Sequence, residues 1–154
     1  MPAAPDIYPM PSFPVLEVAD PAHSASWYQD ALGFQDVFTM ANPDGLVSLS
    51  HLRWTRYADL LLRSDSDSPG PGEKGRGVTL TFAVTDGTVD AVAERARQHG
   101  AQILSEPEDK PWNARECTVA DPDGFQLTFT QGPLKPLDFN RVMAGAPDTP
   151  DPKP

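Results

Sequence analysis

Apolar side chains recur along this chain at two spacings, and each change of spacing marks a new element. Alternation at every second position predicts strands at 13–18, 34–40, 46–52, 57–63, 78–84 and 101–104, and on both sides of a turn at 121–124. Apolar residues three or four positions apart predict helices at 21–32 and 87–99. The order strand, helix and three strands therefore occurs twice.

Both predicted helices carry start and stop signals, and these signals match. Asp20 and Pro21 supply an N-cap and a proline at the first helical position, and Gly33 closes the first helix. Asp86 is the corresponding cap of the second helix, which Gly100 closes. Each aspartate follows Val-x, and the glycines come 13 and 14 residues later. We expect two copies of one unit to pair into a curved mixed sheet around a cleft, an α+β fold.

The last two strands form a predicted hairpin around Asp-Pro-Asp-Gly at 121–124. Proline fixes φ and glycine accepts a positive φ, which suits a tight turn. Trp112 and Arg115 lie where the first of these strands begins, and Phe125, Leu127 and Phe129 share one face of the second. The hairpin is therefore expected to form one edge of the cavity.

This hairpin, with its Trp-Asn-x-Arg-Glu start, resembles the closing hairpin of the vicinal oxygen chelate superfamily, most closely the bleomycin-resistance-type proteins. The superfamily includes glyoxalases, extradiol dioxygenases and metal-free antibiotic-binding proteins. The resemblance implies two βαβββ modules and covers residues 12–131. We divide the chain into an N-terminal arm (1–11), a first module (12–63), a linker (64–75), a second module (76–131) and a Pro-rich C-terminal tail (132–154).

The amino-acid composition indicates which kinds of partner and which cellular compartment suit this chain. The net charge is -10, with 12 Lys and Arg against 22 Asp and Glu, which argues against nucleic acid and anionic membrane as partners. The acidity either favours a cationic ligand or only maintains solubility. No run of about 18 apolar residues and no charged-then-apolar leader is present, which predicts a soluble protein without a membrane span. The single cysteine, Cys117, is expected to be a buried thiol in the reducing cytoplasm.

A metal site is not expected. Metal-dependent members of the superfamily carry four inward-facing ligands, mostly His and Glu, on the first and last strands of each module. The resemblance places those positions at Phe13, Leu60 or Leu61, Thr79 and Thr128, none of which suits a divalent metal. None of the three histidines has a two-His spacing. We therefore predict no metal and no other cofactor.

Aromatic side chains are the candidates for lining the cleft, because flat rings stack on planar heterocycles. Trp27 and Tyr28 are excluded, since they lie on the helix face that packs on the sheet. The predicted ligand-binding residues are Phe38, Trp54, Tyr57, Trp112, Arg115, Phe129 and Glu17.

Three of these candidates have more than one interpretation. Trp54 lies in a polar turn, where its indole needs a ligand or a second subunit as partner. Arg115 holds either a ligand carbonyl or a structural carboxylate. Glu17 is an anionic anchor or a general base if it points inward, and otherwise a solvated carboxylate.

The resemblance implies a cytoplasmic antibiotic-binding self-resistance protein. It would sequester a bulky, partly planar drug of the bleomycin or peptide type by aromatic stacking, without chemical change, at the interface of a homodimer. The alternative is a metal-dependent or metal-free lyase, isomerase or dioxygenase of the same superfamily. A third possibility is a partner-binding module.

The two ends of the chain each have two possible arrangements. The N-terminal arm is either disordered or lies on a neighbouring subunit. The tail at 137–143 either docks as a helical turn or hangs free.

Overall fold

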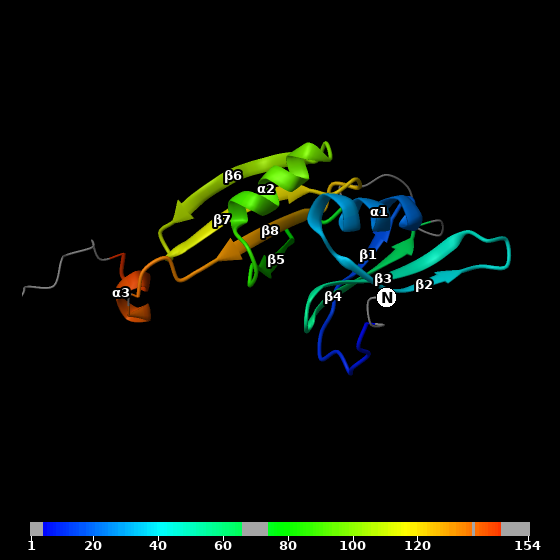
Figure 1. Cartoon of the computed structure of the whole chain (residues 1–154), viewed down its shortest axis with the longest axis horizontal. Helices are drawn as coiled ribbons and strands as arrows, with labels where there is room; N and C mark the ends of the chain where they lie inside the picture. The colour runs from blue at the N-terminus through cyan, green and yellow to red at the C-terminus, as the bar shows by residue number, and fades with distance from the viewer. Residues whose placement is uncertain (1–4, 66–73, 137, 146–154) are drawn as a thin grey trace, which may run out of the picture.

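The computed structural model describes residues 5–65, 74–136 and 138–145, and it contains two four-stranded mixed sheets (Figure 1). The first module comprises β1 (Val15–Val18), α1 (Pro21–Trp27), the π-helical turn η1 (Tyr28–Leu32), β2 (Gln35–Ala41), β3 (Val47–Thr55) and β4 (Ala58–Ser64). The second comprises β5 (Thr79–Ala83), α2 (Val89–Gln98), β6 (Gln102–Lys110), β7 (Ala114–Ala120) and β8 (Gln126–Gln131). A short helix, α3 (Phe139–Met143), follows. The α+β fold of two βαβββ modules is confirmed.

The two sheets have the same topology. Their strand orders are β1-β4-β3-β2 and β5-β8-β7-β6. In each sheet the first strand pairs in parallel with the last, and the remaining neighbours are antiparallel. The internal repeat seen in the sequence is therefore a repeat of topology.

Each sheet has one face packed under its helix and one open face. Leu16, Leu60 and Leu62 are buried on the helix side of the first sheet, as are Leu127 and Phe129 in the second. Their neighbours in sequence point to the other side, because side chains alternate along a strand. The single chain thus presents two open sheet faces.

An aromatic cluster joins the two modules. Phe34 and Trp54 come from the first module and contact Phe82 of the second, with ring centroids 5.4 and 6.4 Å apart. Tyr28 packs edge-on against Phe34, and Trp54 lies 4.9 Å from Phe129. These rings continue into the buried aliphatic core of both sheets, so the modules share one hydrophobic core.

Two local predictions are wrong. The strand expected at 101–104 does not end there but continues as β6 to Lys110, with register shifts on either side of Ser105. β6 is the edge strand of its sheet, where polar residues and a proline are tolerated. The second helix is capped by Thr88 rather than Asp86, because Thr88 Oγ1 accepts from the Ala91 N–H at 3.1 Å.

The remaining segments lie outside the two sheets. Within the described residues, no helix combines the length and apolarity needed to cross a bilayer. Most of the expected linker, 66–73, lies outside the described part of the chain. Residues from Asp6 to Tyr8 run against the first sheet of their own chain, where Figure 1 places the N-terminal segment on the side opposite α1. The tail forms the helical turn α3.

Candidate functional site

The open face of the second sheet carries a row of threonines and ends at an aromatic pocket. Thr79 and Thr81 of β5 lie beside Thr128 of β8, whose hydroxyl is 2.7 Å from that of Thr118. Beyond Thr130 the face ends in a pocket of about 370 Å³. It is lined by Ala83, Trp112, Asn113, Ala114, Thr130, Gly132, Pro133 and Val142. This face is therefore polar but uncharged along most of its length, with one large aromatic at its end.

Trp112 is held in place although half of its surface is exposed. Its exposed fraction is 51%. The indole Nε1–H donates to Glu116 Oε1 at 2.7 Å, and the hydroxyl of Thr130 donates to the same oxygen at 3.1 Å. A single carboxylate oxygen thus fixes the edge of the ring and leaves much of the indole open to solvent.

Asn113 positions the wall of this pocket. Its side-chain amide donates to the Lys135 carbonyl at 2.7 Å, and its Oδ1 accepts from the Lys135 N–H at 3.0 Å. Gly132 passes so close that an added Cβ would lie 2.8 Å from the Asn113 carbonyl oxygen. Asn113 therefore clamps the segment that follows β8, and this segment places Pro133 and Val142 beside Trp112.

The open face of the first sheet combines an apolar row with a polar cluster. Strand register places Val15, Leu61, His51 and Phe38 in one row across the four strands. Phe38 is 52% exposed. The row is thus apolar except at His51.

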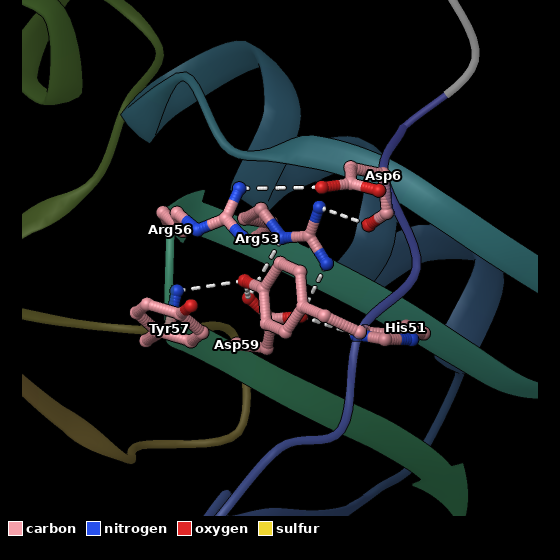
Figure 2. A network of polar contacts seen from close by, with 7 residues as sticks. Asp6, His51, Arg53, Arg56, Tyr57 and Asp59 are labelled. Atoms are coloured by element: carbon pink, nitrogen blue, oxygen red, sulfur yellow. Dashed lines mark hydrogen bonds and ion pairs between the residues drawn. The ribbon is translucent and has the colours of Figure 1, made fainter.

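Asp59 is the centre of the polar cluster (Figure 2). Its carboxylate is fully buried and accepts from Arg53 Nε and Nη2, both at 2.9 Å, from the Tyr8 hydroxyl at 3.1 Å, and from His51 Nε2 at 2.7 Å. Burial acts to raise the pKa of Asp59, but the hydrogen bonds from Arg53, His51 and Tyr8 outweigh it and hold the pKa below its usual range. The carboxylate therefore remains ionised at neutral pH.

Among the predicted site residues, two aromatics lie in the core. Phe129 is fully buried between the sheet and the inter-module cluster. Trp54 is half-buried in the same cluster, and its Nε1–H donates to the Ala83 carbonyl at 2.6 Å. The partner of this indole is thus the second module of the same chain. Trp54 also lines a hollow of about 430 Å³ at the junction of the modules, beside Gly33 and Arg95.

The charged candidates pair with neighbouring side chains. Arg115 lies on the helix side of β7, where it binds Asp90 of α2 at 2.7 and 2.9 Å and Asp109 of β6 at 2.8 Å. The hydrogen bond from Arg115 lowers the pKa of Asp90. Glu17 lies on the open face of β1 and forms an ion pair with Arg63. Arg115 thus holds structural carboxylates here, and Glu17 is not isolated.

Tyr57 and the N-terminal arm meet beside the Asp59 cluster. Tyr57 adopts a positive φ of 65°, and its backbone N–H donates to the Tyr8 hydroxyl at 2.7 Å. The structure therefore divides the predicted site into three places. Trp112 lies at the second open face, Phe38 and Tyr57 lie at the first, and Trp54 lies in the shared core with Phe129.

His51, Asp59 and Tyr8 are not among the predicted ligand-binding residues, although the structure brings them together. His51 and Asp59 are both on the open side of adjacent strands, which their spacing around the 56–57 turn implies once the hairpin is aligned. Tyr8 lies in a segment without periodicity, so nothing in the sequence places it on this sheet.

Residues 13–129 match the family model described as Glyoxalase/Bleomycin resistance protein/Dioxygenase superfamily. The chain belongs to this superfamily. An uncharacterized protein of Mycobacterium tuberculosis (strain H37Rv) is 29% identical over 138 residues, covering 85% of this chain and 79% of that protein.

Two solved structures share the superfamily fold. TioX from Micromonospora sp. ML1 superposes with a TM-score of 0.65 at 24% identity, covering 77% of this chain and 95% of that one. A glyoxalase/bleomycin resistance protein from Streptomyces sp. CB03234 gives a TM-score of 0.59 at 21% identity, covering 77% and 97%. At these identities the likeness establishes the fold.

The residues at the superfamily's metal-ligand positions do not fit a divalent metal. Thr79, Thr128 and Leu61 face the open sides of their sheets, while Leu60 is buried under the helix and Phe13 precedes β1. Hydroxyl, phenyl and alkyl groups are poor ligands where imidazole, carboxylate or thiolate is needed. Within 5–65, 74–136 and 138–145, no three His, Cys, Asp or Glu side chains gather into a group that could hold a metal ion.

Proposed function

We propose that this protein binds a bulky, partly planar antibiotic of the bleomycin or peptide type and sequesters it without chemical change, as a self-resistance protein does. The observation that carries the proposal is the indole of Trp112, which is half exposed yet fixed by Glu116 beside a pocket of about 370 Å³. An aromatic ring held this way loses little conformational freedom when a planar group stacks on it.

The shape of the second open face supports a ligand larger than the pocket. The pocket volume of about 370 Å³ is near the lower end of the range of drug-sized sites, about 300 to 1,000 Å³, so a bulky ligand would extend beyond it. The threonines of β5, β7 and β8 extend from the pocket along the sheet and offer hydroxyl groups that both donate and accept. A peptide-like ligand with one planar end matches this combination.

A homodimer would complete the site. Each open sheet face is uncovered along much of its length in the single chain, and the first carries the exposed apolar side chains of Phe38, Met40 and Val15. An apolar surface beside polar groups is typical of a subunit interface or ligand groove. We propose that two copies bring their open faces together and that both line each cleft.

The charge of the chain favours a cationic drug. A net charge of -10 raises the local concentration of cations and speeds their association. Glu116 places a carboxylate beside the pocket, because it accepts hydrogen bonds from Trp112 and Thr130, which both line it. A cationic substituent next to the planar group would therefore gain affinity at low ionic strength.

One observation favours the alternative of a metal-free lyase or isomerase. His51 lies in the apolar row of the first open face, and the buried carboxylate of Asp59 binds its Nε2. An imidazole oriented by a carboxylate is a pairing that general-base catalysis uses. In that case the first sheet, and not Trp112, would hold the reacting group.

Calorimetric titration with a drug panel in excess chelator separates the two functions. The panel comprises bleomycin-type glycopeptides, quinoxaline-type peptides and mitomycin-type quinones, and each drug is recovered and checked by mass. Saturable binding with the drug intact supports sequestration. A changed mass that disappears with His51→Ala would instead support the enzyme.

A further inference from the structure

We propose that Arg53, Arg56, Tyr57 and Asp59 form a slot for a hydroxyaryl group that carries a neighbouring anion, and that the chain's own Tyr8 occupies this slot as a displaceable strap. The slot is formed by the end of β3, the start of β4 and the turn between them (Figure 2). The inference uses none of the contacts at Trp112, so it stands or fails separately from the proposed function.

The phenol of Tyr8 is recognised at both hydrogen-bonding positions of its oxygen. It donates to Asp59 Oδ1 at 3.1 Å and accepts from the Tyr57 backbone N–H at 2.7 Å. An acceptor and a donor at one oxygen distinguish a phenol from a plain phenyl ring, which would leave both groups without that partner. The slot is therefore specific for a hydroxyl on an aromatic ring.

Two guanidinium groups and one aromatic ring surround the ring of Tyr8. The guanidinium of Arg53 lies 4.3 Å from the Tyr8 ring centroid, and that of Arg56 lies 5.1 Å from it. Tyr57 meets the same ring edge-on at 4.8 Å. These contacts attract any electron-rich ring and carry no requirement for a peptide backbone.

The two contacts that Asp6 of the arm makes indicate that the slot also binds an anion. Arg53 Nη1 donates to the Asp6 carbonyl at 2.7 Å, and Arg56 Nη1 donates to Asp6 Oδ2 at 3.2 Å. A carboxylate two residues from the phenol is thus paired with Arg56. The matching ligand class is a hydroxyaryl compound with a carboxylate and a carbonyl nearby.

The turn between β3 and β4 holds an unusual backbone conformation at Tyr57. Tyr57 has a φ of 65°, a conformation that a bulky residue rarely adopts, and this conformation accompanies the hydrogen bond from its N–H to the phenol. The Asp59 carboxylate is fully buried and is organised by Arg53 and His51 as well as by Tyr8. The recognition groups would therefore keep their places when Tyr8 leaves.

The strap, residues 6–8, buries little surface apart from the Tyr8 side chain. Ile7 is 83% exposed, and 68% of the Asp6 side chain is exposed. Little buried area therefore opposes release, and a free ligand competes with a tethered group at a high effective concentration. If the strap is closed about nine-tenths of the time, removing it strengthens ligand binding about tenfold.

The test uses the blocked tripeptide acetyl-Asp-Ile-Tyr-amide as the probe and the full-length chain, with binding followed by NMR at the Tyr57 amide. Tyr8→Ala empties the slot, and Ile7→Ala is the matched control on the exposed side of the arm. We expect Tyr8→Ala to bind the probe about tenfold more tightly than wild type, with no gain for Ile7→Ala. Acetyl-Asp-Ile-Phe-amide should bind Tyr8→Ala about tenfold more weakly than the tyrosine probe.

Three results would overturn the inference. One is an unchanged affinity in a folded Tyr8→Ala protein, which would make the arm purely structural. The second is an equal gain in affinity for the tyrosine tripeptide in Tyr8→Ala and in Ile7→Ala. The third is equal affinity of Tyr8→Ala for the tyrosine and the phenylalanine tripeptides. Tyr8→Phe, which keeps the ring and removes the hydroxyl, guards against collapse of the emptied slot and should show an intermediate gain.

Discussion

The hydroxyl of Tyr28 donates to Oδ2 of Asp121 at 2.7 Å in the interior of the protein. Tyr28 lies in η1 of the first module, and Asp121 begins the Asp-Pro-Asp-Gly turn of the second. The other carboxylate oxygen of Asp121 accepts from the N–H groups of Asp123 and Phe125. One side chain thus organises the turn and also ties it to the opposite module.

Removing that hydroxyl should weaken the junction. We expect Tyr28→Phe to lower the free energy of unfolding by about 1–3 kcal/mol, because a buried carboxylate oxygen loses its donor. Burial raises the pKa of Asp121 even with the hydrogen bond present, and the variant should raise it further. Urea unfolding measures the change. Thr39→Val, which removes an exposed hydroxyl that donates to Asp36 at the surface, is the control and should stay within about 0.5 kcal/mol.

Asp59 should make stability depend on acid pH. Its pKa is lowered in the folded protein, so its contribution is present above the ordinary pKa of an aspartate and is lost as pH falls through the lowered value. We expect Asp59→Asn to cost about 3–5 kcal/mol at pH 7, because the buried guanidinium of Arg53 loses its counter-charge.

The same variant should lose its disadvantage as the solution is acidified from about pH 5 toward pH 2, since asparagine does not titrate. Unfolding curves over this range measure the difference. The control is Glu17→Gln, which removes an exposed ion pair with Arg63 and should cost about 0–1 kcal/mol. A constant difference between wild type and Asp59→Asn at all pH values would contradict this account of Asp59.

Trp54 should behave as a structural residue. Replacing it with phenylalanine removes the hydrogen bond to the Ala83 carbonyl and part of the inter-module cluster, at a cost of about 1–2 kcal/mol. Drug affinity should change less than twofold. A large loss of affinity without a loss of stability would show that Trp54 contacts the ligand.

Cys117 should be unreactive while the protein is folded. It is buried under α2, and burial raises the pKa of its thiol to about 11. The thiolate is the reactive form, so a disulfide reagent at pH 8 should modify the native protein far more slowly than the protein in urea. Cys117 is the single cysteine, so the absorbance signal has one source. Equal rates would mean that this strand opens readily.

The fold could be predicted because its signals are local. The Asp20-Pro21 start, the Gly33 stop and the 121–124 turn each fix a backbone conformation that needs no distant partner. The second half of β6 was missed because Ser105 to Lys110 is polar on an edge strand, where pairing with β7 determines the structure. Thr88 rather than Asp86 is the N-cap, because α2 begins at Val89, two residues later than predicted.

The site was less predictable, since it depends on which aromatics face the core. Strand alternation gives two faces but does not say which one lies under the helix. Phe129 and Phe38 both satisfy that alternation, yet one is fully buried and the other half exposed. Tyr8 joins Asp59 across 51 positions of sequence through the fold alone.

The most direct test of sequestration is the quenching of tryptophan fluorescence on titration with a drug that the panel has identified, in excess chelator. Wild type, Trp112→Ala and the control Trp27→Phe are compared, because Trp27 packs on Tyr28 away from the pocket. We predict saturable quenching in wild type and Trp27→Phe, and at least a tenfold weaker affinity in Trp112→Ala, equivalent to about 1.4 kcal/mol. Undiminished affinity in Trp112→Ala would contradict the assignment of Trp112 as the stacking surface.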